Sequence, residues 1–274
     1  MVLPVVVLTP ADLSALRRAV LALENPVLAA RLTNVVGKPI VLIGHALPAF
    51  ASQAISKAAS NGLEIALNVA LRTLERTPRA GSQLLHKAMA TASGAAGGAF
   101  GLAALPIELP ISTIIMLRSI ADAARNEGEN LSDPKTALAC IQVFALGGRS
   151  GSVDASESGY FAVRGMLAKS VTEAARFIAE RGLVEQGAPV IVRFVTQVAA
   201  RFGAVVTQKV AAQALPIMGA LGGAVVNYAF IEHFQDMAKG HFTVRRLERA
   251  YGDDMVRAEY DRLAQELRTR RRVA

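Results

Sequence analysis

Apolar residues recur at helical spacing through most of the chain. Thr9-Pro10-Ala11-Asp12 has the composition of a helix start, with an N-cap, a proline at the first helical position and an acid in the first turn. Leu13, Leu16 and Val20 then fall on one helix face. A longer stretch, at about residues 46–77, has leucines and alanines three and four apart. Because no alternating strand pattern persists anywhere, the sequence predicts an all-α protein.

Prolines and glycines divide the remaining pattern into further helices. Pro106 and Pro110 interrupt the segment 82–127, and Ser132-Asp133-Pro134 resembles another cap followed by proline, which starts a helix ending at Gly147. Four more helices are predicted, at about residues 160–182, 188–214, 216–239 and 242–272. The whole predicts a compact bundle of close-packed, Gly/Ala-rich apolar helices with amphipathic helices outside. The polar stretch 147–159 marks a loop or an internal boundary within an otherwise single domain.

Three stretches of the chain lack charged side chains altogether, at residues 39–56, 88–107 and 210–231. About 20 such residues are enough to span a hydrocarbon core. Their Ala and Gly content and their prolines make stable insertion marginal, so we expect them to pack beside a bilayer rather than cross it.

Small residues in these stretches indicate where helices approach each other closely. Gly97 and Gly101, and again Gly219 and Gly223, have the Gly-xxx-Gly spacing that removes side chains from one helix face. This spacing serves soluble cores and membrane-embedded pairs alike, and both interpretations stay open. The residues predicted to build helix contacts or to line an apolar ligand site are Gly97, Gly101, Pro106, Pro216, Gly219, Gly223 and Asn227.

The composition is apolar and basic. Hydrophobic residues make up 52% of the 274 residues and charged residues 19%, yet the net charge is +8. Arginines are densest at the C-terminal end, where Arg268, Arg270, Arg271 and Arg272 are predicted to contact anionic lipid head groups. A salt-bridged helix facing water is the alternative. The lone Cys140, in an apolar run, excludes an intramolecular disulfide and favours a reducing cytoplasm.

The sequence contains no short catalytic motif with an established mechanism. A Walker A loop, a Gly-x-Gly-x-x-Gly turn, a His-Glu-x-x-His pair and a Gly-x-Ser-x-Gly elbow are all absent from it. Ser132 and Lys135 match Ser-x-x-Lys, but helix capping explains them better. We therefore expect no cofactor, and the sequence argues against an enzyme.

The densest polar cluster is Glu232-His233-Phe234-Gln235-Asp236, with His241 just beyond. His233 and Asp236 lie three residues apart, on one helix face, where they could coordinate a metal or relay a proton. A hydrolase or peptidase using residues 232–241 is accordingly the alternative function. It needs a further ligand or a serine from elsewhere in the fold.

Glycines, prolines and apolar residues form a specific combination in three blocks. They are Gly37-Lys38-Pro39-Ile40 with Leu47-Pro48; Gly97-Gly98-Ala99-Phe100-Gly101 through Leu105-Pro106 to Arg118-Ser119-Ile120-Ala121; and 215–223 with Asn227, Ala238, Phe242, Arg245-Arg246-Leu247 and Tyr251-Gly252. In this combination the chain resembles the EcsC family of bacterial proteins over most of its length. It departs from the family at Glu127-Gly128, where an aromatic residue usually precedes the glycine.

The resemblance implies one EcsC-like helical domain over residues 1–274, in a family named for a gene that accompanies an ATP-binding-cassette transporter. It carries over no catalytic residue, because the matching positions are types that build helix contacts and turns. Asn227 is expected to bond across helices.

Together these observations predict a cytoplasmic protein, peripheral to the inner membrane, that binds lipid or another apolar ligand without catalysis. A scaffold that binds a transporter subunit or another helical protein would use the same apolar faces. Nucleic acid is an unlikely partner, because the basic residues are not interleaved with aromatic stacking groups.

Overall fold

The computed structural model describes residues 7–24, 28, 31–33, 49–73, 105–147, 159–181, 188–213 and 219–273. Its helices, in chain order, are α1 (Pro10–Glu24), α4 (Ala49–Thr73), α6 (Leu105–Asn126), α7 (Pro134–Leu146), α8 (Gly159–Arg181), α9 (Pro189–Gln213), α10 (Gly219–Tyr251) and α11 (Asp253–Val273). None of these described residues forms a strand. The predicted all-α bundle is confirmed. Residues 148–158, most of the predicted boundary segment, lie outside the described residues.

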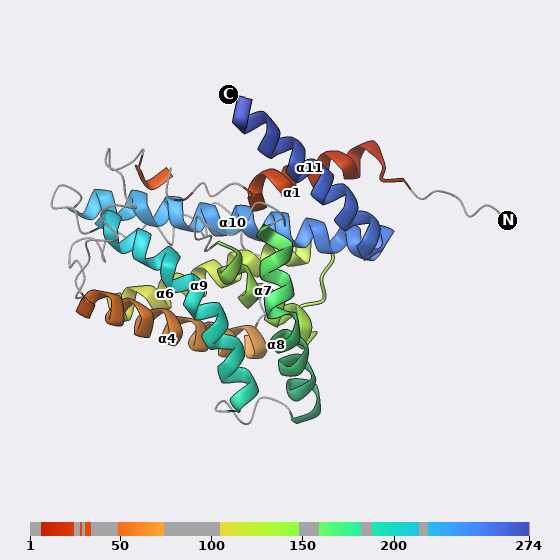
Figure 1. Cartoon of the computed structure of the whole chain (residues 1–274). Coiled ribbons are helices and arrows are strands. Elements are labelled where there is room, and N and C mark those ends of the chain that lie inside the picture. Colours follow the sequence, from red (N-terminus) through yellow and green to blue (C-terminus); the bar gives the residue numbers. More distant parts are fainter. Residues whose placement is uncertain are drawn as a thin grey trace.

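The long helix α10 organises the bundle. Figure 1 shows it running across the molecule, with α1 and α11 packed on one side and α6 and α9 on the other. Helix α4 lies against α6 and α9. Helix α7 is the central one: it contacts α4, α6, α8, α9 and α10, and every residue from Thr136 to Leu146 is buried. A helix that is apolar all round is suited to such a position.

Burial in α7 also determines the reactivity of the single cysteine. Cys140 is fully buried, and burial raises the pKa of its thiol to about 12. Because the thiolate is the reactive form of cysteine, this side chain serves the core as a small hydrophobe.

Two predicted helix starts are confirmed by their caps. The Thr9 hydroxyl oxygen accepts a hydrogen bond from the Asp12 backbone N–H at 3.2 Å, at the start of α1. The Asp133 carboxylate accepts one from the Lys135 backbone N–H at 2.9 Å, ahead of Pro134. The Ser-x-x-Lys match in this segment therefore belongs to a capping structure.

Two predicted helix breaks are wrong. Helix α6 continues from Leu105 through Pro110 to Asn126. Pro110, the sixth residue of this helix, cannot donate the backbone hydrogen bond that another residue would make there, and α6 continues without it.

The second error is at Gly240, which lies inside α10. A Cβ atom there would come within 2.8 Å of the Leu23 Cγ and 3.3 Å of the Ala19 carbonyl oxygen, both on α1. Gly240 therefore allows α1 and α10 to pack in close contact, and α10 continues through it. The break falls at Gly252, whose φ of +89° is the left-handed conformation common after helices.

A charged network fastens the corner between α6 and α7 to α10. Arg245 donates from Nε and Nη2 to the Glu129 carboxylate, at 2.8 and 3.0 Å. Arg246 joins Glu127 on this corner to Asp12 on α1, at 2.8 and 2.9 Å. Burial alone would raise the pKa of Glu129, but the Arg245 guanidinium holds it below the ordinary value. Glu127 is therefore part of an ion-pair network that joins this corner to α10 and α1.

The close contact between α1 and α10 predicts unequal effects of the same substitution at two glycines. Gly240→Ala should lower the free energy of unfolding by about 1–3 kcal/mol, because the new methyl group overlaps Leu23. Gly165→Ala, in the exposed part of α8 with open space around it, should raise it by about 0.5–1 kcal/mol. Urea unfolding followed by circular dichroism measures both. Equal effects at the two positions would contradict this packing.

Candidate functional site

The polar cluster at residues 232–241 does not form one site. Glu232 and Asp236 both face Arg31, at 3.3 and 2.9 Å. The His233 Nε2 donates instead to the Gly147 carbonyl oxygen at 3.2 Å. Within the described residues, no group of three or more His, Cys, Asp or Glu side chains is placed to hold a metal ion. Arg31 thus binds the two acids that the hydrolase alternative would use, while His233 is bonded elsewhere.

His241 belongs to another buried cluster, beneath α1. The Arg164 guanidinium donates to the Tyr160 hydroxyl oxygen at 3.2 Å, and this hydroxyl and His241 Nδ1 share a hydrogen bond of 2.9 Å. His241 Nε2 has no hydrogen-bond partner in the described part of the chain. Burial first, and then Arg164 and Arg245, keep the pKa of His241 well below its ordinary value. This histidine is neutral and enclosed by protein.

Glu24 joins α1 to this cluster. Its Oε1 accepts hydrogen bonds from the Tyr160 backbone N–H at 3.2 Å and from the Tyr260 hydroxyl at 3.0 Å. A carboxylate is favourable here, because Tyr160 lies in the first turn of α8, at the positive end of the helix dipole. Sequence reasoning missed this cluster, since its members lie on four helices with no shared motif.

Buried His233 predicts a loss of stability in acid. Burial, partly offset by the bond to Gly147, lowers the pKa of His233 to about 4. Between the unfolded value of about 6.5 and this value only the unfolded state binds the proton, so stability falls as pH falls through that window, by on the order of 3 kcal/mol. His233→Gln keeps a donor for Gly147 and should show a shallower fall between about pH 7 and pH 5 in urea unfolding. An unchanged slope would show that His233 is not the titrating group.

A fully buried ion pair joins the ends of α6, α9 and α10. Lys209 Nζ lies 2.6 Å from Glu108 Oε1, and Asn227 Nδ2 donates to the same oxygen at 3.0 Å. The Lys209 ammonium also lies over the Phe230 ring, 5.1 Å from its centroid. Burial lowers the pKa of Lys209, while Glu108 acts in the opposite direction. Asn227, predicted to bond across helices, reaches from α10 to α6.

The other predicted contact residues have varied placements. Gly97, Gly101 and Pro216 lie outside the described residues. Gly219 begins α10, and Gly223 is buried one turn later. Pro106 is the second residue of α6 and is exposed.

The arginine-rich end of α11 packs beside α1. Arg268 turns toward Glu24, with 3.9 Å between Nη2 and Oε2. Arg270 is exposed and, with Arg17 of α1, lines a shallow groove of about 80 Å³. The remaining groove residues are Val20, Leu21, Leu263, Glu266 and Leu267. The side chains of Arg271 and Arg272 lie outside the described residues. The groove thus combines cationic edges with an apolar floor.

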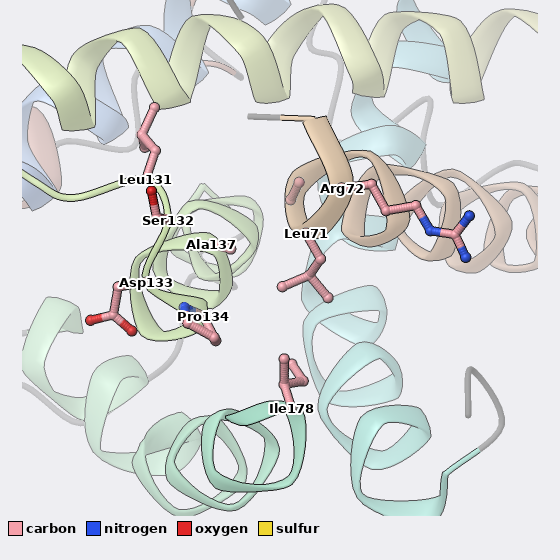
Figure 2. A pocket seen from close by; sticks show the side chains of 9 residues that line it. Leu71, Arg72, Leu131, Ser132, Asp133, Pro134, Ala137 and Ile178 are labelled. Atoms are coloured by element: carbon pink, nitrogen blue, oxygen red, sulfur yellow. The ribbon is translucent and has the colours of Figure 1, made fainter. Parts of the chain in front are cut away.

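A second small pocket, also about 80 Å³, lies where α4, α7 and α8 meet. Figure 2 shows Leu71 and Ile178 directed into it, while the Arg72 guanidinium and the Asp133 carboxylate point away. Asp133 is already engaged as the cap of α7. The described residues that line this pocket therefore provide no acid and base that converge on it.

The Lys209–Glu108 pair gives a double-mutant prediction. Lys209→Met leaves a buried carboxylate without its cation and should lower the free energy of unfolding by about 3–5 kcal/mol. Adding Glu108→Gln removes the stranded charge, keeps an acceptor for Asn227, and should restore much of the loss. Urea unfolding of both single variants and the double variant tests this. Strictly additive losses would show that the two charges are not coupled.

Fold and site together define a class: an all-α bundle in which several buried polar side chains pair across helices. The EcsC protein family model matches residues 9–247. The chain belongs to the EcsC protein family. No curated protein and no solved structure matches it. Helix α11, which forms one side of the groove, follows the matched residues.

Proposed function

We propose that this protein is a peripheral membrane protein, without catalysis, that holds anionic phospholipid head groups between α1 and α11. The observation that carries the proposal is the groove with Arg17 and Arg270 at its edges and leucines in its floor. Guanidinium groups bind phosphate oxygens in a two-pronged geometry. The apolar floor offers a place for the carbon atoms next to the phosphate.

The surroundings of the groove support attraction to an anionic surface. Arg18, next to Arg17 on α1, is exposed as well, and Leu21 is 45% exposed beside them. Glu266, an acid in the groove, is paired with Arg262. Each basic residue near an anionic leaflet contributes about 1 kcal/mol, and the net charge of +8 adds long-range attraction.

The cytoplasmic face of the inner membrane is the location we propose. Cytoplasmic leaflets carry anionic lipid, and the one cysteine is buried and reduced. Support of an ATP-binding-cassette transporter or of an envelope process is the cellular role that fits a protein held there.

Vesicle flotation tests this proposal. The purified chain should float with phosphatidylcholine vesicles that contain phosphatidylglycerol, and less so as salt is raised, because exposed charges are screened. Arg17→Glu with Arg270→Glu should weaken binding about 10-fold or more, since two attractive charges are reversed.

The matched control is Lys169→Glu with Arg176→Glu, which makes the same change of charge on exposed side chains of α8. It should keep most of the binding. Equal weakening by the two double variants would show that only net charge matters, and a wild-type chain that stays at the bottom of the gradient would remove the proposal.

A further inference from the structure

At one end of the bundle, several large apolar side chains are exposed while charged and polar side chains nearby are buried. In the first turns of α6, Ile107 and Ile111 are 71% and 47% exposed, while Glu108 between them is 6% exposed. Ser112 and Thr113 also face inward, and both donate to the Leu109 carbonyl oxygen. At this helix end two isoleucines therefore lie outside, while the glutamate, the serine and the threonine lie inside beside the buried Leu109.

The neighbouring helix ends repeat this arrangement. On α10, Val225 and Tyr228 are 46% and 40% exposed, while Asn227 is 2% exposed. On α9, the Lys209 side chain is fully buried. The bonds among Glu108, Lys209 and Asn227 hold these ends together. Figure 1 shows the start of α6, the end of α9 and the start of α10 on the same side of the molecule.

Water does not explain this arrangement. A glutamate and a lysine near helix ends could reach solvent at no cost, whereas burying two ions costs several kcal/mol each before their attraction is counted. Large apolar side chains gain nothing from exposure to water. In hydrocarbon the preferences are reversed: charged groups face the protein interior and pair, and apolar side chains face outward.

The uncharged length of the described helix ends is sufficient for one leaflet. The next charged side chain along α6 that is exposed is Arg118, and along α10 the first charged residue is Glu232. Both lie about 20 Å from the start of their helices, at 1.5 Å per residue. A hydrocarbon core is about 30 Å thick, so each leaflet contributes about 15 Å. The described, uncharged ends of these two helices are therefore long enough to enter one leaflet.

Helix α9 gives a related signal. Its segment Pro189–Ala212 is long and apolar enough to cross a membrane by length and composition, which core helices of soluble proteins also satisfy. Its Lys209 pairs internally with Glu108, and Arg193 near its other end is exposed. One charged residue of α9 is thus paired inside the protein at the uncharged end of the bundle, and another is exposed at the opposite end of the helix.

We infer that the start of α6, the end of α9 and the start of α10 form a membrane-inserting surface. This surface contacts the hydrocarbon of one bilayer leaflet. Ile107, Ile111, Val225 and Tyr228 contact the acyl chains. The inference rests on the proposed function only in requiring a bilayer, since the groove lies on other helices.

Single tryptophan reporters test this inference directly, because the chain contains no tryptophan. Tyr228→Trp and Ile107→Trp are the reporters, and Met166→Trp, on α8 and 60% exposed, is the matched control. The probe is a phosphatidylcholine/phosphatidylglycerol vesicle with and without acyl chains brominated near their middle. With vesicles, emission from positions 228 and 107 should move to shorter wavelength and be quenched by bromine. Emission from position 166 should change little.

The outcomes separate the two proposals. If the chain floats while positions 228 and 107 keep water-exposed emission, the inserting surface is overturned and the head-group proposal stands. In the Arg17→Glu/Arg270→Glu background, the bound fraction should show the same wavelength shift with less binding. Short-wavelength emission before vesicles are added would show that protein already covers this surface, which also overturns the inference.

Discussion

A buried charge needs a partner of opposite sign, and this requirement determines how the helices of the bundle meet. Lys209 on α9 is fully buried, and a carboxylate can reach it only if α6 starts beside the end of α9. Glu108 and Asn227 meet that requirement from α6 and α10. Such a pair contributes less to the stability of the fold than to its specificity. Any other arrangement of these helices would leave a buried charge without its partner.

The same principle recurs at the opposite end of α10. Glu129, at the corner between α6 and α7, is almost wholly buried and meets Arg245 and Arg249 of α10. Glu24 at the end of α1 meets Tyr160 and Tyr260. Each acid comes from a helix end or a corner and is satisfied by a different helix. The apolar faces supply the driving force for packing. The polar contacts select one arrangement from the many that apolar helices allow.

The two proposed membrane contacts have different physical bases. The groove between α1 and α11 offers charge to head groups and is sensitive to salt. The ends of α6, α9 and α10 offer a surface without charge, with the ionic groups turned inward. Helix α11 follows the residues that match the family, whereas the inverted end lies within them.

The sequence by itself determined the helical class, the starts of α1 and α7, and the family, because spacing, caps and glycine–proline blocks are local signals. It misplaced helix breaks at Pro110 and Gly240: α6 continues through the proline, and the glycine serves the contact with α1, which the local sequence does not show. It named Asn227 but not Glu108 or Lys209, which lie far apart in the chain and match no motif. Only the tertiary structure decided which charges face inward and which apolar residues remain outside, because burial is a property of neighbours that local sequence does not encode.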